Sequence, residues 1–200
     1  MFYLFVRGVL RIFLAVFGRM EVLGRENIPA TGGLVVAANH TSNLDPIVVG
    51  CALDRKISYL AKEELFRIPV LAWVCRNLEA FPIKRGAGDR GAIRESLKIL
   101  ESGRLFGIFP EGTRSKTGEL QVGKPGAAMI ALKANVPILP VALIGTNKFP
   151  GKIKVIIGQP IHFERYYGQK VGREELEEVT SEVMGQIGNL LKVNRVEKIS

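Results

Sequence analysis

Two polar segments of the chain carry residue types that suit acid–base chemistry. In the first, Asn39-His40-Thr41-Ser42-Asn43-Leu44-Asp45, an imidazole precedes a carboxylate by five positions. An aspartate that accepts a hydrogen bond from histidine stabilises the imidazolium and leaves the other ring nitrogen free to take a proton from a hydroxyl. On a helix the two side chains would point about 140° apart, so we expect a loop that folds Asp45 back onto His40. In the alternative interpretation Asp45 only caps a helix and His40 is a buried structural histidine.

The second segment, PEGTRS at 110–115, offers groups that suit an anionic ligand. The guanidinium of Arg114 is a planar, two-pronged donor for phosphate, and Gly112 permits close approach of the backbone. Arg85 and Lys124 add positive charge from neighbouring loops. The alternative interpretation is a surface ion pair between Arg114 and Glu111 on a solvated basic face.

Alternating strand and helix patterns must position these two segments. Continuous apolar runs predict buried strands at 34–38, 105–109, 138–144 and 153–157. Helices are expected after Asp45-Pro46, after Asp89 and over 173–192. The alternation predicts an α/β fold with a mostly parallel central sheet flanked by helices. Because loops after parallel strands gather at one sheet edge, we expect the segments after residues 38 and 109 to meet there.

Residues 1–18 are apolar apart from two glycines and two arginines, Arg7 and Arg11, which share one stripe of a helix with Gly18. For full insertion, the two arginines would cost about 5–7 kcal/mol and the large apolar side chains would return about 3–7 kcal/mol. We therefore predict an amphipathic helix in the membrane interface over 1–20, followed by a single domain over 21–200. Phe5 and Phe13 are expected to contact the membrane, with the arginines toward lipid phosphates. The alternative is a helix docked on the core.

Composition narrows the classes of partner and site. The net charge of +9 favours anionic partners, and the chain has no recognisable nucleic-acid-binding module, so a nucleic-acid partner is not expected. Two cysteines without a C-x-x-C pair exclude a disulfide scaffold and point to a reducing compartment. Two histidines exclude a multi-histidine metal centre, and no metal site is expected.

Two nucleotide-binding patterns also occur. GELQVGKP at 118–125 matches a phosphate-binding loop, but proline replaces the hydroxyl residue that would bind magnesium. GAGDRG at 86–91 matches a dinucleotide-binding loop and leaves an NAD-dependent oxidoreductase as an alternative. That alternative requires a central apolar strand before the glycines. The preceding FPIKR, with proline and two basic residues, does not read as one.

In order along residues 24–160, four blocks resemble the glycerolipid acyltransferases typified by lysophosphatidic acid acyltransferase. NHTSNLD is similar to the family's N-H-x4-D block, and FPEGTRS at 109–115 is similar to its third block. FPIKR at 81–85 and VPILPV at 136–141 resemble the second and fourth. The resemblance implies an acyl transfer from a thioester carrier to the free hydroxyl of lysophosphatidic acid, giving phosphatidic acid.

The resemblance also implies roles for individual residues. His40 would be the catalytic base and Asp45 its charge partner. The glycerol phosphate would be held by Arg85, Glu111, Gly112 and Arg114, with Lys124 nearby. The acyl chain would contact Val136, Pro137, Ile138 and Pro140.

The same resemblance bears on partners and location. No cofactor is expected beyond the co-substrate, acyl coenzyme A or acyl carrier protein, and an anionic membrane surface on its cytoplasmic face is the expected location. Two further alternatives are an acyltransferase for another lyso-lipid and a non-catalytic lipid-binding protein of the membrane surface.

Overall fold

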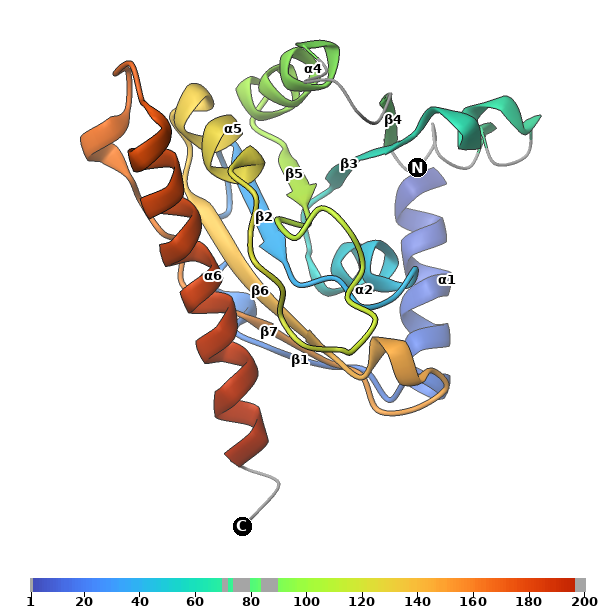
Figure 1. Cartoon of the computed structure of the whole chain (residues 1–200). Coiled ribbons are helices and arrows are strands. Elements are labelled where there is room, and N and C mark those ends of the chain that lie inside the picture. The colour runs from blue at the N-terminus through green and yellow to red at the C-terminus, as the bar shows by residue number, and fades with distance from the viewer. Residues whose placement is uncertain (1, 70–71, 74–79, 84–89, 197–200) are drawn as a thin grey trace.

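Seven strands and the helices around them form one α/β layer structure in the described part of this computed structural model, which covers residues 2–69, 72–73, 80–83 and 90–196 (Figure 1). The helices are α1 (Phe2–Phe17), α2 (Asp45–Ala52), α4 (Arg90–Glu101), α5 (Gly126–Ala134) and α6 (Arg173–Val196). The strands are β1 (Glu21–Leu23), β2 (Leu34–Ala38), β3 (Ile57–Lys62), β4 (Ala80–Ile83), β5 (Leu105–Ile108), β6 (Ile138–Ile144) and β7 (Lys154–Ile157).

The sheet has the order β1-β7-β6-β2-β5-β3-β4 and is parallel except between β6 and β7. Strand β2 lies between β6 and β5, with Val36 opposite Leu139 on one side and Gly107 on the other. All five residues of β2 are buried, as its continuous apolar run predicts. The expected mostly parallel α/β fold is confirmed, and β2 and β5 deliver their following loops to the same edge.

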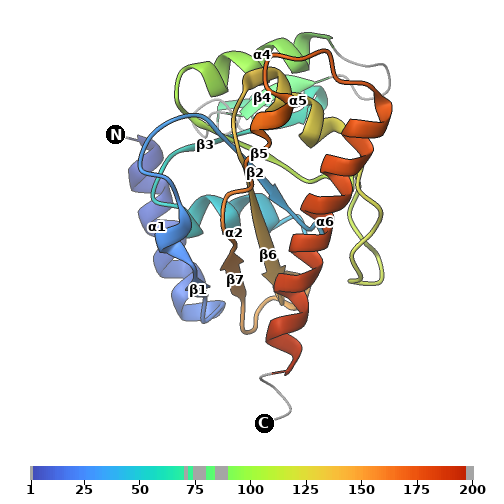
Figure 2. The same ribbon diagram turned by 90° about the vertical axis from the view of Figure 1, so that its left-hand side faces the viewer.

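Helices cover both faces of the sheet (Figures 1 and 2), and an apolar cluster lies on each face. Because successive side chains of a strand point to opposite faces, Leu34 and Val36 pack with α1 and α2. Val35 and Ala37 pack on the other face with α4, α5 and α6. The site described below lies on the α1 and α2 side.

The sequence pattern missed the strands β1, β3 and β4. Strand β4 includes three residues of the segment FPIKR, and its place at the sheet edge agrees with the expectation that this segment is not a buried central strand. Pro82 is tolerated because β4 is an edge strand, where a missing N–H costs no ladder hydrogen bond. The GAGDRG loop lies largely outside the described residues, but the strand before it is at the sheet edge rather than the centre. The oxidoreductase alternative therefore lacks the central strand that it requires.

Helix α1 lies beside α2 (Figure 1), and its arginines face the protein. Arg11 donates from Nε to the Cys51 carbonyl at 2.7 Å and from Nη2 to the Leu53 carbonyl at 2.8 Å. Arg7 donates to the carbonyls of Leu53 and Asp54 at 3.2 and 3.0 Å. The expectation that both arginines point toward lipid phosphates is therefore wrong. The reason is that the last carbonyls of a helix lack partners within it and attract cationic donors.

The opposite side of α1 is apolar and exposed. Phe5 is 70% exposed, Ile12 68% and Phe13 42%, and Leu4, Val9, Val16 and Phe17 continue the same surface. In the part of the chain that the structure describes, no helix has both the length and the apolar character needed to cross a membrane.

Candidate active site

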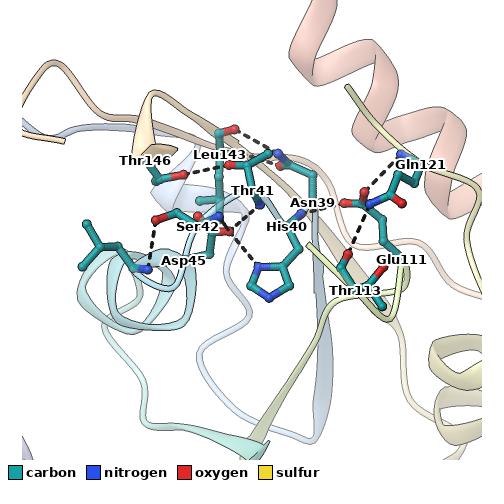
Figure 3. A network of polar contacts seen from close by, with 11 residues as sticks. Asn39, His40, Thr41, Ser42, Asp45, Glu111, Thr113, Gln121, Leu143 and Thr146 are labelled. Carbon is teal, nitrogen blue, oxygen red and sulfur yellow. Dashed lines mark hydrogen bonds and ion pairs between the residues drawn. The ribbon is translucent and has the colours of Figure 1, made fainter. Parts of the chain in front are cut away.

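The two predicted loops meet beyond the carboxyl ends of β2 and β5 (Figure 3). His40 follows β2, and Glu111 follows β5. The His40 N–H donates to Glu111 Oε1 at 2.6 Å, and the His40 carbonyl accepts from the Ser115 N–H at 2.8 Å. The expected meeting of the two segments at one sheet edge is confirmed.

Asp45 folds back onto His40, as the loop interpretation predicts (Figure 3). Its Oδ2 lies 2.8 Å from His40 Nδ1 and accepts the backbone N–H groups of Thr41 and Ser42, each at 2.7 Å. Asp45 is fully buried and begins α2, where the positive end of the helix dipole stabilises an anion. The His40 side chain is 18% exposed, so a neutral ring that donates from Nδ1 presents Nε2 as a base.

Asn39 and Thr41 fix the loop that carries His40, and the sequence analysis did not identify either. The Asn39 side chain donates to the Leu143 carbonyl at 3.0 Å and accepts the Leu143 N–H at 2.7 Å. This buried pairing continues the hydrogen bonding between β2 and β6 one residue beyond β2. Thr41 Oγ1 lies 3.0 Å from Thr146 Oγ1 after β6. The position of Asn39 between a buried strand and His40 was the signal available in the sequence.

The Glu111 carboxylate binds backbone N–H groups, whereas the resemblance implies that it holds the glycerol phosphate. Its side chain is 3% exposed, and its second oxygen, Oε2, accepts the Gln121 N–H at 3.1 Å. Both carboxylate oxygens are thus occupied by backbone donors, and a buried anion would repel a phosphate. This corrects the expectation that the Glu111 side chain holds the glycerol phosphate.

Arg114 and Lys124 line the same cavity as His40. Gly112 has a φ of 73°, and a side chain there would meet Lys124 Nζ at 3.0 Å, so glycine lets the lysine cross the loop. Among the described residues no acidic group lies within ion-pair distance of Arg114, which excludes the surface pair with Glu111. Lys116 adds a third cation to the cavity wall. The prediction for Arg85 lies outside the described residues.

The cavity has a volume of about 1540 Å³ and combines these cations with apolar walls. It extends along the sheet from His40 to Ile57, which begins β3. Its apolar lining comprises Leu10, Pro46, Ile47, Ile57, Tyr59, Leu60, Phe106, Ile108 and Phe109. Gly107 is required beneath Tyr59, because a Cβ at that position would overlap the tyrosine ring. Tyr3, Arg7 and Leu10 of α1 also form part of this wall.

The apolar wall is not the one that the fourth block implies. Val136 and Ile138 pack with α5 and α6 on the opposite face of the sheet, and neither they nor Pro137 and Pro140 line the cavity. This corrects the predicted acyl-chain residues. The physical reason is that β6 lies inside the sheet with both faces buried, so its apolar run does not indicate which face borders a cavity.

Two polar groups in the apolar wall stay neutral near pH 7. Burial raises the pKa of the Cys51 thiol to about 11, despite the opposing charges of Arg11 and Arg7. Burial also raises the pKa of the Tyr59 hydroxyl well above its ordinary value. Within the described residues, no three His, Cys, Asp or Glu side chains are grouped so as to hold a metal ion. The described residues thus bring the His40–Asp45 pair together with cationic and apolar side chains in one cavity.

The mostly parallel α/β fold and the His40–Asp45 pair beside a cationic, apolar cavity suit an acyltransferase. Comparison with known proteins supports this class. The family model described as acyltransferase matches residues 19–144, and the chain belongs to that family. It is 36% identical over 166 residues to the 1-acyl-sn-glycerol-3-phosphate acyltransferase of Bacillus subtilis (strain 168), which covers 80% of this chain and 82% of that protein. The protein of the same name from Borreliella burgdorferi is 34% identical over 150 residues, or 74% of this chain and 60% of that protein.

A solved structure supports the same conclusion. The structure of the 1-acyl-sn-glycerophosphate (LPA) acyltransferase PlsC from Thermotoga maritima matches with a TM-score of 0.71 at 30% identity. The match covers 94% of this chain and 81% of that one. The resemblance seen in the four sequence blocks is confirmed at the level of the family.

Proposed function

We propose that this protein transfers a fatty acyl group from a thioester carrier to the free hydroxyl of lysophosphatidic acid, forming phosphatidic acid. The observation that carries the proposal is the placement of the His40–Asp45 pair in the wall of a cavity that also holds Arg114 and Lys124. Such a cavity offers cations for a phosphate and apolar surface for acyl chains. The relatives named above act, by their names, on the same acceptor.

In the proposed reaction, His40 Nε2 removes the proton of the acceptor hydroxyl as its oxygen attacks the thioester carbonyl carbon. Asp45 stabilises the imidazolium, the new C–O bond forms, the C–S bond breaks, and the proton passes from Nε2 to the departing sulfur. General-base action of this kind contributes about 10²–10⁴ in rate. The reaction needs neither a metal nor a covalent acyl-enzyme, because the base acts directly on the hydroxyl.

The positively charged side chains orient the acceptor. Arg114 and Lys124 would bind the phosphate at the cavity wall, with Gly112 providing backbone access. Arg85 is proposed as a further phosphate contact from its place in the second sequence block. Such positioning holds the hydroxyl near Nε2 and converts a bimolecular encounter into a reaction of bound groups.

The exposed apolar surface of α1 is proposed to lie in the membrane interface. Phe5 and Phe13 would enter the acyl region, and the net charge of +9 would favour the anionic cytoplasmic face. Because the opposite side of α1 lines the cavity, a lipid acceptor would need to move only a short way from the bilayer to the site. The donor is proposed to be acyl coenzyme A or acyl carrier protein.

Acyl transfer by the purified chain tests the proposal. We would supply lysophosphatidic acid in mixed micelles with each thioester donor in turn and measure phosphatidic acid by mass spectrometry. The wild type and His162→Ala are expected to form product, because His162 lies in the wall of a different surface hollow. His40→Ala should form almost none. Product from other lyso-lipids alone would overturn the acceptor, and full activity of His40→Ala would overturn the mechanism.

A further inference from the structure

The catalytic histidine is held through its backbone by the loop that binds the acceptor. Glu111 accepts the His40 N–H, and the Ser115 N–H donates to the His40 carbonyl. Arg114 lies between these two contact residues in the sequence and lines the cavity. The base and the proposed phosphate ligand are therefore joined by a few bonds of one short segment.

The Glu111 carboxylate closes this segment into a compact unit. Its two oxygens accept the N–H groups of His40 at 2.6 Å and Gln121 at 3.1 Å (Figure 3). The Gln121 side chain adds a bond from Nε2 to the Thr113 carbonyl at 3.3 Å. Further along, the Lys124 N–H donates to the Pro110 carbonyl at 2.8 Å. One buried carboxylate thus connects His40 with both ends of the loop 111–121.

We infer that Glu111 is a positioning residue for catalysis rather than an acceptor ligand. This inference rests on the proposed function. The Glu111 carboxylate sets the distance between His40 Nε2 and the hydroxyl of an acceptor held by Arg114 and Lys124. Two backbone donors need two acceptor oxygens, which a carboxylate supplies and an amide does not. Hydrogen bonds to an ionised acceptor are also the stronger kind, which suits a contact that must fix a reacting group.

The variant Glu111→Gln separates the two roles kinetically. It keeps the size of the side chain but turns an NH₂ group toward one of the two N–H donors. We expect kcat to fall about 10- to 100-fold, the rate equivalent of one charge-assisted hydrogen bond, while the KM for lysophosphatidic acid stays within about threefold. Glu119→Gln is the matched control, since it removes an exposed carboxylate from the same loop, and it should behave as the wild type. An increase in the acceptor KM with kcat unchanged would overturn the inference, and so would an unchanged kcat.

A second measurement needs no turnover. The chain has two histidines, so protein labelled with ¹⁵N-histidine gives two backbone amide signals, which His162→Asn assigns. The short bond to Glu111 predicts a strongly downfield His40 amide proton, which Glu111→Gln should move upfield and Glu119→Gln should leave in place. An unmoved His40 signal would overturn the inference. If the wild type acylates no lysophosphatidic acid, the proposed function fails, while this signal still decides whether Glu111 positions His40.

Discussion

The ring of Phe109 stacks on the imidazole of His40, with centroids 4.1 Å apart and planes inclined by 19°. Phe109 comes directly after β5, so the strand that leads into the loop 110–115 also supports one face of the His40 ring. Asp45 fixes one edge of that ring through Nδ1. A ring held at one edge and one face has a defined direction for Nε2, which is what a general base requires.

Phe109→Leu should lower kcat about 2- to 10-fold, because an aromatic pair contributes about 0.5–1.5 kcal/mol beyond its buried area. Phe163→Leu is a suitable control, since Phe163 is buried on the opposite face of the sheet. It should lower the thermal midpoint without changing kcat of the folded enzyme. Steady-state kinetics and thermal unfolding of both variants check this expectation, and equal effects on kcat would contradict it.

Asp45→Asn should reduce kcat about 10²–10⁴-fold, because the tautomer of His40 would no longer be fixed and its action as a general base would be lost. The amide also presents a donor where three donors now converge on one oxygen. Some loss of stability is therefore expected as well. Kinetics at saturating acceptor, corrected for the folded fraction from circular dichroism, provide the measurement. Wild-type turnover in this variant would exclude the dyad.

The thiol of Cys51 should resist alkylation at pH 8. With a pKa raised to about 11 by burial, only about one thiol in a thousand is ionised at that pH, and the thiolate is the reactive form. Raising the pH toward 11 should increase the reaction rate with iodoacetamide. Mass spectrometry of a Cys75→Ser variant isolates Cys51, and the same variant unfolded in guanidinium should react readily at pH 8. Rapid modification of the folded protein would contradict the prediction.

The ion pair between Arg11 and Asp54 should contribute to stability above about pH 4 and lose its contribution in acid. The hydrogen bond from Arg11 holds the pKa of the Asp54 carboxyl below its ordinary value of 3.8. A depressed folded-state pKa means that the contribution is present above 3.8 and disappears as pH falls through the lower folded value. Because Asp54 is 62% exposed, the effect should stay below about 1 kcal/mol. Urea unfolding of wild type and Asp54→Asn between pH 3 and 7 should give curves that converge at the acid end.

The outward face of α1 should govern vesicle binding. Replacing Phe5 and Ile12 with serine removes two of the most exposed apolar side chains of the helix. We expect affinity for phosphatidylglycerol-containing vesicles to fall about 10²- to 10⁴-fold, because two fully buried side chains together contribute about 3–6 kcal/mol. Co-sedimentation measures the binding, and turnover in detergent micelles should stay close to wild type. Unchanged binding would show that another surface makes the contact.

Local patterns predicted much of the fold and the central part of the site. The apolar runs of β2 and β6 are long and buried on both faces, so the sequence identifies them within one residue. The return of Asp45 onto His40 followed from the five-residue spacing and a loop between strand and helix. Strand β1 has three residues and depends on pairing with the distant β7, which no local pattern encodes.

The direction in which each side of a helix or strand points was harder to predict than the position of the helix or strand in the sequence. Arg7 and Arg11 were expected to point toward lipid phosphates, because the carbonyls at the end of α2 that accept their hydrogen bonds are distant in sequence. Val136 and Ile138 are apolar enough for an acyl chain, yet they pack with α5 and α6 and do not line the cavity. Contacts that span 40 and 46 positions decided the direction of the two arginines.

The docking of Arg7 and Arg11 on α2 has a consequence for the order of events during synthesis. Before the domain forms, the first helix carries two unneutralised charges that would cost about 5–7 kcal/mol at the centre of a bilayer. Those charges oppose its capture by the insertion machinery as a spanning anchor. Once α2 has formed, the carbonyls at its end accept hydrogen bonds from both guanidinium groups, and the first helix keeps one exposed apolar face. Packing of the first helix on α2 is therefore expected to precede any contact of that helix with a lipid surface.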